Sequence, residues 1–315
     1  MKIPAESALA GLAPIAAVER DTGLSKELLR TWERRYGFPS PKRDESGDRR
    51  YGSEEIEKLR LIKRLIDIGR RPRQLVALSV GELALLTRES APGAPACLAP
   101  SRELGVCLSA IKGHHIETLR SALQDRLLES GLSSFVREFL APLTALVGQS
   151  WSRGEIDIAQ EHLYSRAVES VLHGALHVLS SAPRTPSLVL ATVPGEEHAL
   201  GLLMAETLFT LARATCLCLG VEAPIGEIDR AARARRADVV ALSFSTVLAG
   251  SLVRRGVTEL RAVLPANCEI WIGGANAALA QCVRPGVTHV TSLEAIAATV
   301  DAWRERHASR VPTFA

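Results

Sequence analysis

One histidine in the sequence is placed where it could bind a metal ion. His198 lies in VPGEEHALGLLMAETL, between an apolar run and a helical pattern. A histidine binds metal through one ring nitrogen, and a nearby carboxylate can accept a hydrogen bond from the other. Glu196 is suited to this, and Gly201, completing the spacing E-x-H-x-x-G, leaves room for a bulky ring. The segment predicts a metal site in a strand-to-helix loop.

Two later loops favour a binding slot at the same place. LSFSTVLAG puts Ser243 and Ser245 at the end of an apolar run, and WIGGANAAL does the same for Gly273 and Gly274. Ligands bind at the carboxyl edge of open α/β sheets, where such loops meet. A lone loop histidine is more often a surface or capping residue. Small and hydroxyl residues after successive strands nevertheless predict a deep slot rather than a catalytic triad.

A second group of candidates lies in an apolar helical region, SWSRGEIDIAQEHLYSR. It consists of Trp151 and, ten residues later, the adjacent pair Glu161 and His162. An indole can cover a flat ring system, and a carboxylate can accept hydrogen bonds from hydroxyl groups. Trp151 by itself would be read as ordinary core.

The elements that must position these residues form three parts. We expect a winged helix-turn-helix over residues 1–88 and a Pro/Ala/Gly-rich linker over 89–101. A helical period with breaks at Gly113, Gly131 and Arg153-Gly154 predicts a four-helix bundle over 102–183. Five short apolar runs alternating with helical patterns predict a Rossmann-like, doubly wound parallel sheet over 184–315. The fold class is therefore multidomain, α and α/β.

The N-terminal part carries an excess of positive charge. Between Arg20 and Arg73 there are 16 Lys and Arg against 10 Asp and Glu, whereas the whole chain has a net charge of only +3. SKELLRTWERRYG predicts a recognition helix for a major groove, after a turn at Gly23. The following basic connector resembles a wing. The candidate DNA-binding residues are Lys26, Arg30, Arg34, Arg43, Arg49, Arg50 and Tyr51.

Composition excludes several classes of protein. No apolar run approaches about 18 residues, which a membrane helix requires, and the first residues do not resemble a signal peptide. The six cysteines form no C-x-x-C pair, so they indicate buried thiols in a reducing compartment. We therefore expect a cytoplasmic protein without membrane contact.

The basic segment closely resembles the MerR-type winged helix-turn-helix family. The resemblance covers about residues 14–80 and rests on TGLS, LRTWERRYG and DRRYGSEEIEKLRLI. It implies binding to double-stranded operator DNA.

The later loops resemble the cobalamin-binding domain family, with its pattern D-x-H-x-x-G, then S-x-[LTS], then G-G. Glu196 stands at the position of the aspartate and keeps the carboxylate. The resemblance implies that His198 is the lower axial ligand of cobalt. It also implies that Ser243 and Ser245 face the base of the nucleotide tail, for which Gly273 and Gly274 make room.

The spacing W-x9-E-H is similar to that of light-sensing MerR-type regulators that bind adenosylcobalamin. The resemblance implies that Trp151 and Glu161 pack against the adenosyl group. It further implies a non-enzymatic repressor that binds DNA as an oligomer, a tetramer, and is released when light breaks the cobalt–carbon bond. Ser152 stands where relatives carry a histidine able to bind cobalt after photolysis, which leaves His162 as another donor. Two alternatives remain: a corrinoid carrier for methyl transfer, and a MerR-type regulator that senses another ligand or acts in its apo form.

Overall fold

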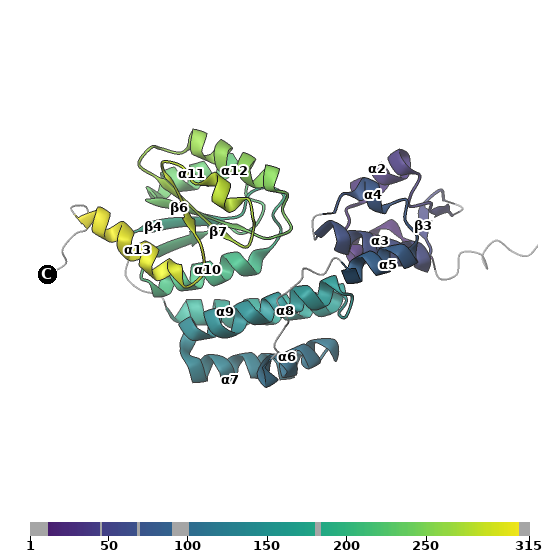
Figure 1. Cartoon of the computed structure of the whole chain (residues 1–315), viewed down its shortest axis with the longest axis horizontal. Helices are drawn as coiled ribbons and strands as arrows, with labels where there is room; N and C mark the ends of the chain where they lie inside the picture. The colour runs from purple at the N-terminus through teal and green to yellow at the C-terminus, as the bar shows by residue number, and fades with distance from the viewer. Residues whose placement is uncertain (1–11, 45, 68–69, 90–100, 180–183, 309–315) are drawn as a thin grey trace, which may run out of the picture. The chain divides into compact units, whose positions relative to one another are not determined.

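The computed structural model describes residues 12–44, 46–67, 70–89, 101–179 and 184–308 (Figure 1). Its contacts divide the chain into two compact units. One consists of Met1–Pro100 with Val147–Glu161, and the other of Ser101–Leu146 with His162–Ala315. Most of the predicted linker, residues 90–100, lies outside the described residues. None of the described helices is long and apolar enough to cross a membrane.

The first unit contains short helices around a three-stranded antiparallel sheet of order β1-β3-β2. Its elements are β1 (Ala13–Pro14), α1 (Ile15–Thr22), α2 (Lys26–Tyr36), β2 (Lys42–Arg43), β3 (Arg49–Tyr51), α3 (Ser53–Asp67), α4 (Pro72–Leu75) and α5 (Val80–Glu89). Ser25 caps α2 by accepting a hydrogen bond from the Leu28 amide, and Gly23 ends α1 in the left-handed conformation. Leu29 and Trp32 bury one side of α2 in the core. The basic side of α2 is therefore left facing outward.

The helical segment consists of α6 (Arg102–Lys112), α7 (Ile116–Ser134), the π-helix η2 (Phe135–Leu140), α8 (Ala141–Ser152) and α9 (Ile158–Val178). The predicted ends at Gly113 and at Arg153-Gly154 agree with these bounds. Gly131 also breaks the helical backbone as predicted, because its φ of 71° and ψ of 157° are non-helical and form a kink within α7, before the chain enters η2. Within the second unit, the hydroxyls of Thr144 and Tyr164 lie 2.6 Å apart and join α8 to α9.

The rest of the second unit is a five-stranded parallel sheet of order β5-β4-β6-β7-β8. Its strands and helices, in chain order, are β4 (Ser187–Ala191), α10 (Ala199–Leu211), β5 (Thr215–Cys218), α11 (Ile225–Arg235), β6 (Val239–Phe244), α12 (Gly250–Val263), β7 (Glu269–Gly274), η3 (Leu279–Cys282), β8 (Val287–Val290) and α13 (Ala295–Arg306). Helices α11 and α12 cover one face and α10 and α13 the other (Figure 1). The predicted doubly wound sheet is confirmed.

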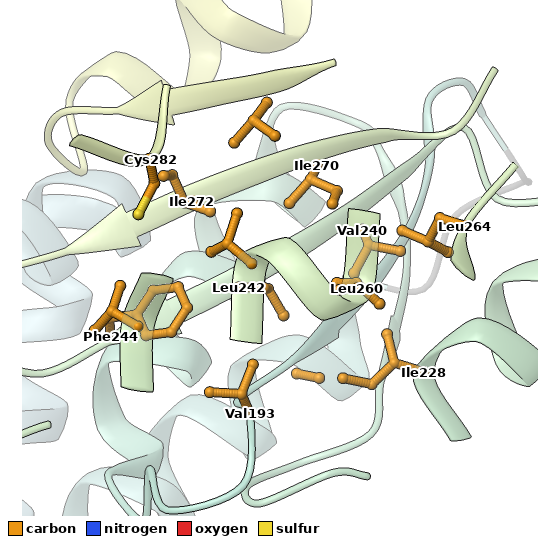
Figure 2. Packing of buried hydrophobic residues seen from close by; sticks show 14 of the residues in the cluster. Val193, Ile228, Val240, Leu242, Phe244, Leu260, Leu264, Ile270, Ile272 and Cys282 are labelled. Atoms are coloured by element: carbon orange, nitrogen blue, oxygen red, sulfur yellow. The ribbon is translucent and has the colours of Figure 1, made fainter. Parts of the chain in front are cut away.

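Side chains of alternate strand residues fill both faces of this sheet. Ile270 and Ile272 pack with Leu260 on the side of α11 and α12 (Figure 2). Trp271, between them in sequence, points to the other side, where its ring centroid lies 5.7 Å from that of Phe209 on α10. The strand order reverses between β4 and β6, because β5 lies on one side of β4 and all later strands lie on the other. This switch point is where open α/β sheets bind ligands.

Candidate functional site

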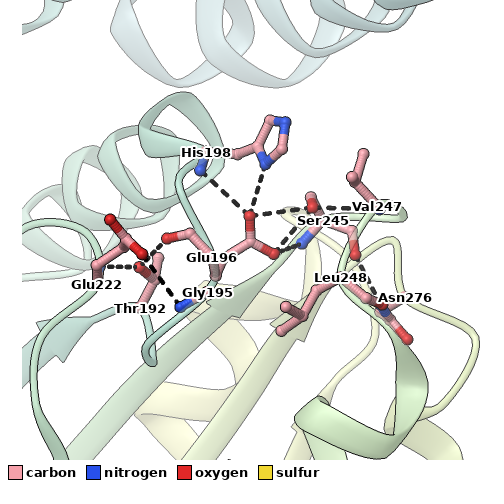
Figure 3. Close-up of polar contacts among 9 residues, drawn as sticks. All are labelled: Thr192, Gly195, Glu196, His198, Glu222, Ser245, Val247, Leu248 and Asn276. Carbon is pink, nitrogen blue, oxygen red and sulfur yellow. Dashed lines mark hydrogen bonds and ion pairs between the residues drawn. The ribbon is translucent and has the colours of Figure 1, made fainter. Parts of the chain in front are cut away.

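A buried carboxylate lies at the switch point, in the loop after β4. Only 1% of Glu196 is exposed. Its Oε2 accepts hydrogen bonds from the amide of Ser245 at 2.7 Å and from the hydroxyl of Ser245 at 2.8 Å (Figure 3). Burial raises the pKa of the Glu196 carboxyl, but the hydrogen bonds from His198 and Ser245 outweigh burial and leave this pKa below its ordinary value. The group is therefore held as a carboxylate.

The same carboxylate orients His198. Its Oε1 lies 2.6 Å from Nδ1 of the imidazole and accepts the backbone N–H of His198 at 3.2 Å. A proton on Nδ1 that donates to Glu196 leaves the lone pair of the neutral ring on Nε2, the arrangement found in metal-binding histidines. The His198 side chain is 53% exposed, so the ring is accessible although its carboxylate partner is not.

The predicted serine and glycine loops meet at this edge because β6 and β7 pair in register, with Ser243 beside Gly273 and Phe244 beside Gly274. A Cβ on Gly201 would lie 3.1 Å from Oγ of Ser243. Gly274 has φ of 118°, and a Cβ there would lie 2.0 Å from the carbonyl oxygen of Phe244. Larger side chains would fill the space that these glycines leave between the loops.

Two further residues hold the loops, and sequence reasoning missed them. Asn276 Nδ2 donates to the carbonyls of Ser245 and Leu248, at 2.7 and 2.8 Å. Thr192 Oγ1 donates to the carbonyl of Glu196 at 2.6 Å and accepts the amide of Glu222 at 2.8 Å. Thr192 directly follows β4 and Asn276 lies two residues after β7, and a polar residue so close to the end of an apolar run is the signal that could have found them.

These residues fit a cofactor that carries a metal ion. His198 is an oriented imidazole with a carboxylate behind it, and glycines clear the strand ends around it. Such a donor set suits a metal that needs one nitrogen ligand from the protein. The glycines suit a bulky group that must pass close to the backbone.

The second group of candidates is distributed over both compact units. Trp151, in the last turn of α8, and Glu161, in the first turn of α9, are half-buried and belong to the first unit. His162 is exposed and belongs to the second unit, as His198 does. Their joint role stays a prediction. Ser152 is 5% exposed, and its hydroxyl donates to the carbonyl of Gln149 at 2.8 Å.

The candidate DNA-binding residues differ in how they are held. Arg30 and Arg34 are exposed on α2, Lys26 pairs with Glu19 at 3.2 Å, and Arg43 donates to the carbonyl of Gly47 at 2.9 Å. Two arginines of β3 make internal ion pairs. Nε of Arg49 lies 2.7 Å from Glu33 Oε2 on α2, and Nε of Arg50 lies 2.8 Å from Asp44 Oδ2. The pair of Glu33 and Arg49 therefore joins the wing to the recognition helix.

Tyr51 does not fit its predicted role in DNA binding. It is fully buried, because β3 pairs with β1 at this residue and turns the ring into the core. Burial raises the pKa of Tyr51 to about 12. Its hydroxyl has no hydrogen-bond partner among the residues that the structure describes.

Comparisons with known proteins match two parts of the chain to families and the chain as a whole to two repressors. The MerR HTH family regulatory protein family matches residues 14–77, and the B12 binding domain family matches residues 108–173. The HTH-type transcriptional repressor CarH of Myxococcus xanthus is 34% identical over 279 residues, which cover 83% of this chain and 88% of that protein. The repressor CarA of the same organism is 32% identical over 232 residues, covering 73% and 75%.

A solved structure supports the fold of the second unit. The Methanosarcina barkeri monomethylamine corrinoid protein aligns with a TM-score of 0.50 and 16% identity, over 62% of this chain and 96% of that one. At this identity the likeness concerns the fold alone.

Proposed function

This chain belongs to the family of HTH-type transcriptional repressors that combine a MerR-type domain with a B12-binding domain, and we propose that it represses transcription under the control of a bound adenosylcobalamin. The observation that carries the proposal is the hydrogen bond from Nδ1 of His198 to the buried Glu196 at the switch point of the sheet. It supplies an oriented nitrogen ligand where the fold binds cofactors.

When bound, cobalamin would supply a cobalt ion that accepts a nitrogen ligand and, in its adenosyl form, a light-sensitive cobalt–carbon bond. His198 would be the nitrogen ligand of the cobalt. Glu196 would hold the ring in orientation, and Ser245 would keep Glu196 ionised through two hydrogen bonds. Ser243, Gly273 and Gly274 would line the passage for the nucleotide tail.

By the resemblance to the light-sensing regulators, Trp151 and Glu161 would contact the adenosyl group, and His162 would be a donor available after its loss. Loss of the group then removes contacts that favour one assembly over another. A ligand that binds one assembly more tightly shifts the population toward it. We propose that the adenosyl form stabilises an oligomer, a tetramer, which holds operator DNA in the cytoplasm, and that light releases the DNA.

The main alternative is a corrinoid carrier for methyl transfer. The monomethylamine corrinoid protein shares the fold, which by itself favours neither function, whereas the match to a MerR-type domain over residues 14–77 favours a regulator. A regulator that acts in its apo form is the other alternative. A carrier would deliver methyl groups without DNA, and an apo regulator would bind operator DNA equally with and without cobalamin.

The experiment is an absorption spectrum of the reconstituted protein before and after green light, paired with an operator-binding assay in the dark and after illumination. We expect a base-off, His-on spectrum in the dark and weaker DNA binding after light. His198→Ala should lose the His-on spectrum and much of its cobalamin affinity, whereas the control His177→Ala, an exposed histidine on α9, should keep both. An unchanged spectrum in His198→Ala refutes the assignment of the cobalt ligand.

A further inference from the structure

The turn between α8 and α9, residues 153–157, packs with the DNA-binding domain. The contacts of the chain place Val147–Glu161 in the same compact unit as α1, α2 and α3. Trp151 is the second-last residue of α8, just before this turn, and Glu161 lies in the first turn of the helix after it. The candidate adenosyl contacts therefore flank a segment that touches the winged helix-turn-helix.

Two close approaches define the contact. A Cβ on Gly154 would lie 2.7 Å from Nη1 of Arg64, so the turn passes directly against the guanidinium in the last turn of α3. Cδ1 of Ile158 lies 3.6 Å from the position of a Cβ on Gly23. Gly23 closes the turn that leads into α2. The α8–α9 turn thus approaches α3, and the first residue of α9 approaches the turn between α1 and α2.

Charge and burial support the same contact. Burial lowers the pKa of Arg64, while the negative charges of Glu57 and Asp157 act in the opposite direction. Asp157 is also the N-cap of α9, since its Oδ1 accepts the amide of Gln160 at 2.8 Å. Ile156, between Asp157 and the glycine, is only 2% exposed. A turn with a buried apolar residue and the acidic Asp157 is therefore held against Arg64 of α3.

The turn is also fixed to the end of α8. The amide of Gly154 donates to the carbonyl of Trp151, and the amide of Glu155 donates to the carbonyl of Ser150, each at 2.9 Å. Ser150 and Ser152 are almost fully buried. A displacement of Trp151 must therefore move the turn or break these bonds.

We propose that the α8–α9 turn is a docking element, which binds the surface of the DNA-binding domain around Gly23 and Arg64 and carries a displacement of Trp151 to the recognition helix. The docking is argued from the contacts above. The event that would displace Trp151, loss of the adenosyl group, rests on the proposed function.

The first test uses the full chain without cofactor and measures hydrogen exchange of the peptide spanning residues 151–158. Arg64→Glu sets two like charges against each other, and we expect the Gly154 and Glu155 amides to exchange roughly three- to tenfold faster. Adding Asp157→Asn should restore most of the protection, because asparagine still caps the helix but no longer repels the glutamate. Arg73→Glu, an exposed residue of α4, is the matched charge reversal and should leave the exchange unchanged.

Wild-type exchange in a folded Arg64→Glu variant overturns the docking, and so does failure of Asp157→Asn to rescue it. Thermal melting by circular dichroism checks that each variant folds. Asp157→Asn alone keeps the helix cap and should speed exchange by about two- to threefold. No change in this variant would also count against the pair.

The second test measures the coupling in the loaded protein. The ratio of operator affinities with and without adenosylcobalamin should shrink at least threefold in Arg64→Glu and recover in the double variant, while the cobalamin spectrum stays unchanged. An undiminished ratio overturns transmission through the turn. If the wild-type protein binds operator DNA equally with and without adenosylcobalamin, the proposed function fails. The exchange experiment then still decides the docking.

Discussion

Replacing Gly274 by alanine should destabilise the sheet far more than its position at a strand end suggests. Its φ of 118° is a conformation that an L-residue adopts only with strain, and the new Cβ would lie 2.0 Å from the Phe244 carbonyl oxygen. Non-bonded heavy atoms prefer a separation of about 3.5 Å or more. The ends of β6 and β7 would have to separate by about 1.5 Å, since neither is a flexible side chain. That movement weakens the hydrogen bond from the Ala275 amide to Phe244 O, now 3.1 Å.

We expect the strain to cost about 1–3 kcal/mol and the overlap, with the damaged hydrogen bond, about 2–3 kcal/mol more. Gly220→Ala is the matched control, because φ there is 84° but no atom lies within 4 Å of the new Cβ. Urea unfolding of both variants, monitored by far-ultraviolet circular dichroism, isolates the overlap as the difference between them. Equal losses of stability in the two variants would refute the claim that this close approach shapes the site.

Three other outcomes follow from the described contacts. Arg30→Ala should lower the slope of log affinity for operator DNA against log salt by about one. Glu33→Gln should weaken binding without changing this slope, because it only releases the wing from α2. Equal slopes in the two variants would contradict the assignment of a phosphate contact to Arg30 and a structural role to Glu33. Trp151→Ala should still bind cobalamin but no longer oligomerise selectively with the adenosyl form, which size-exclusion chromatography in the dark would measure. Oligomers specific to the adenosyl form that persist in this variant would exclude a contact of Trp151 with the adenosyl group. Burial raises the pKa of Tyr51 from 10.0 to about 12, so the stability that its neutral phenol contributes below pH 10 is lost as pH rises to 12. Tyr51→Phe should flatten that decline in unfolding experiments, and an equally steep decline counts against it.

Sequence patterns predicted the sheet and its site because both depend on local rules. An apolar run followed by small or polar residues places those residues at one edge of a parallel sheet, and Glu196, His198 and Ser245 meet there. The strand order brings these residues together through pairing of strands that are distant in the chain. The alternation of strands and helices in the sequence predicts this parallel pairing. The expectation that a carboxylate orients the histidine agrees with the 2.6 Å contact.

The remainder depends on contacts that no short pattern contains. Tyr51 ends a strand of only three residues, so alternation could not tell a wing contact from a core residue. The contact of Gly154 with Arg64 joins residues 90 positions apart in the chain, and nothing in either segment marks it.

The hydrogen bonds of Glu196 affect the free energy of cofactor binding as well as the orientation of His198. The imidazole of His198 is oriented in the apo protein, so the loss of its rotational freedom belongs to folding rather than to association. Immobilising such a side chain on binding would cost about 0.5–1.5 kcal/mol, or roughly two- to tenfold in affinity. A preoriented imidazole also needs no rotation before it coordinates a metal ion.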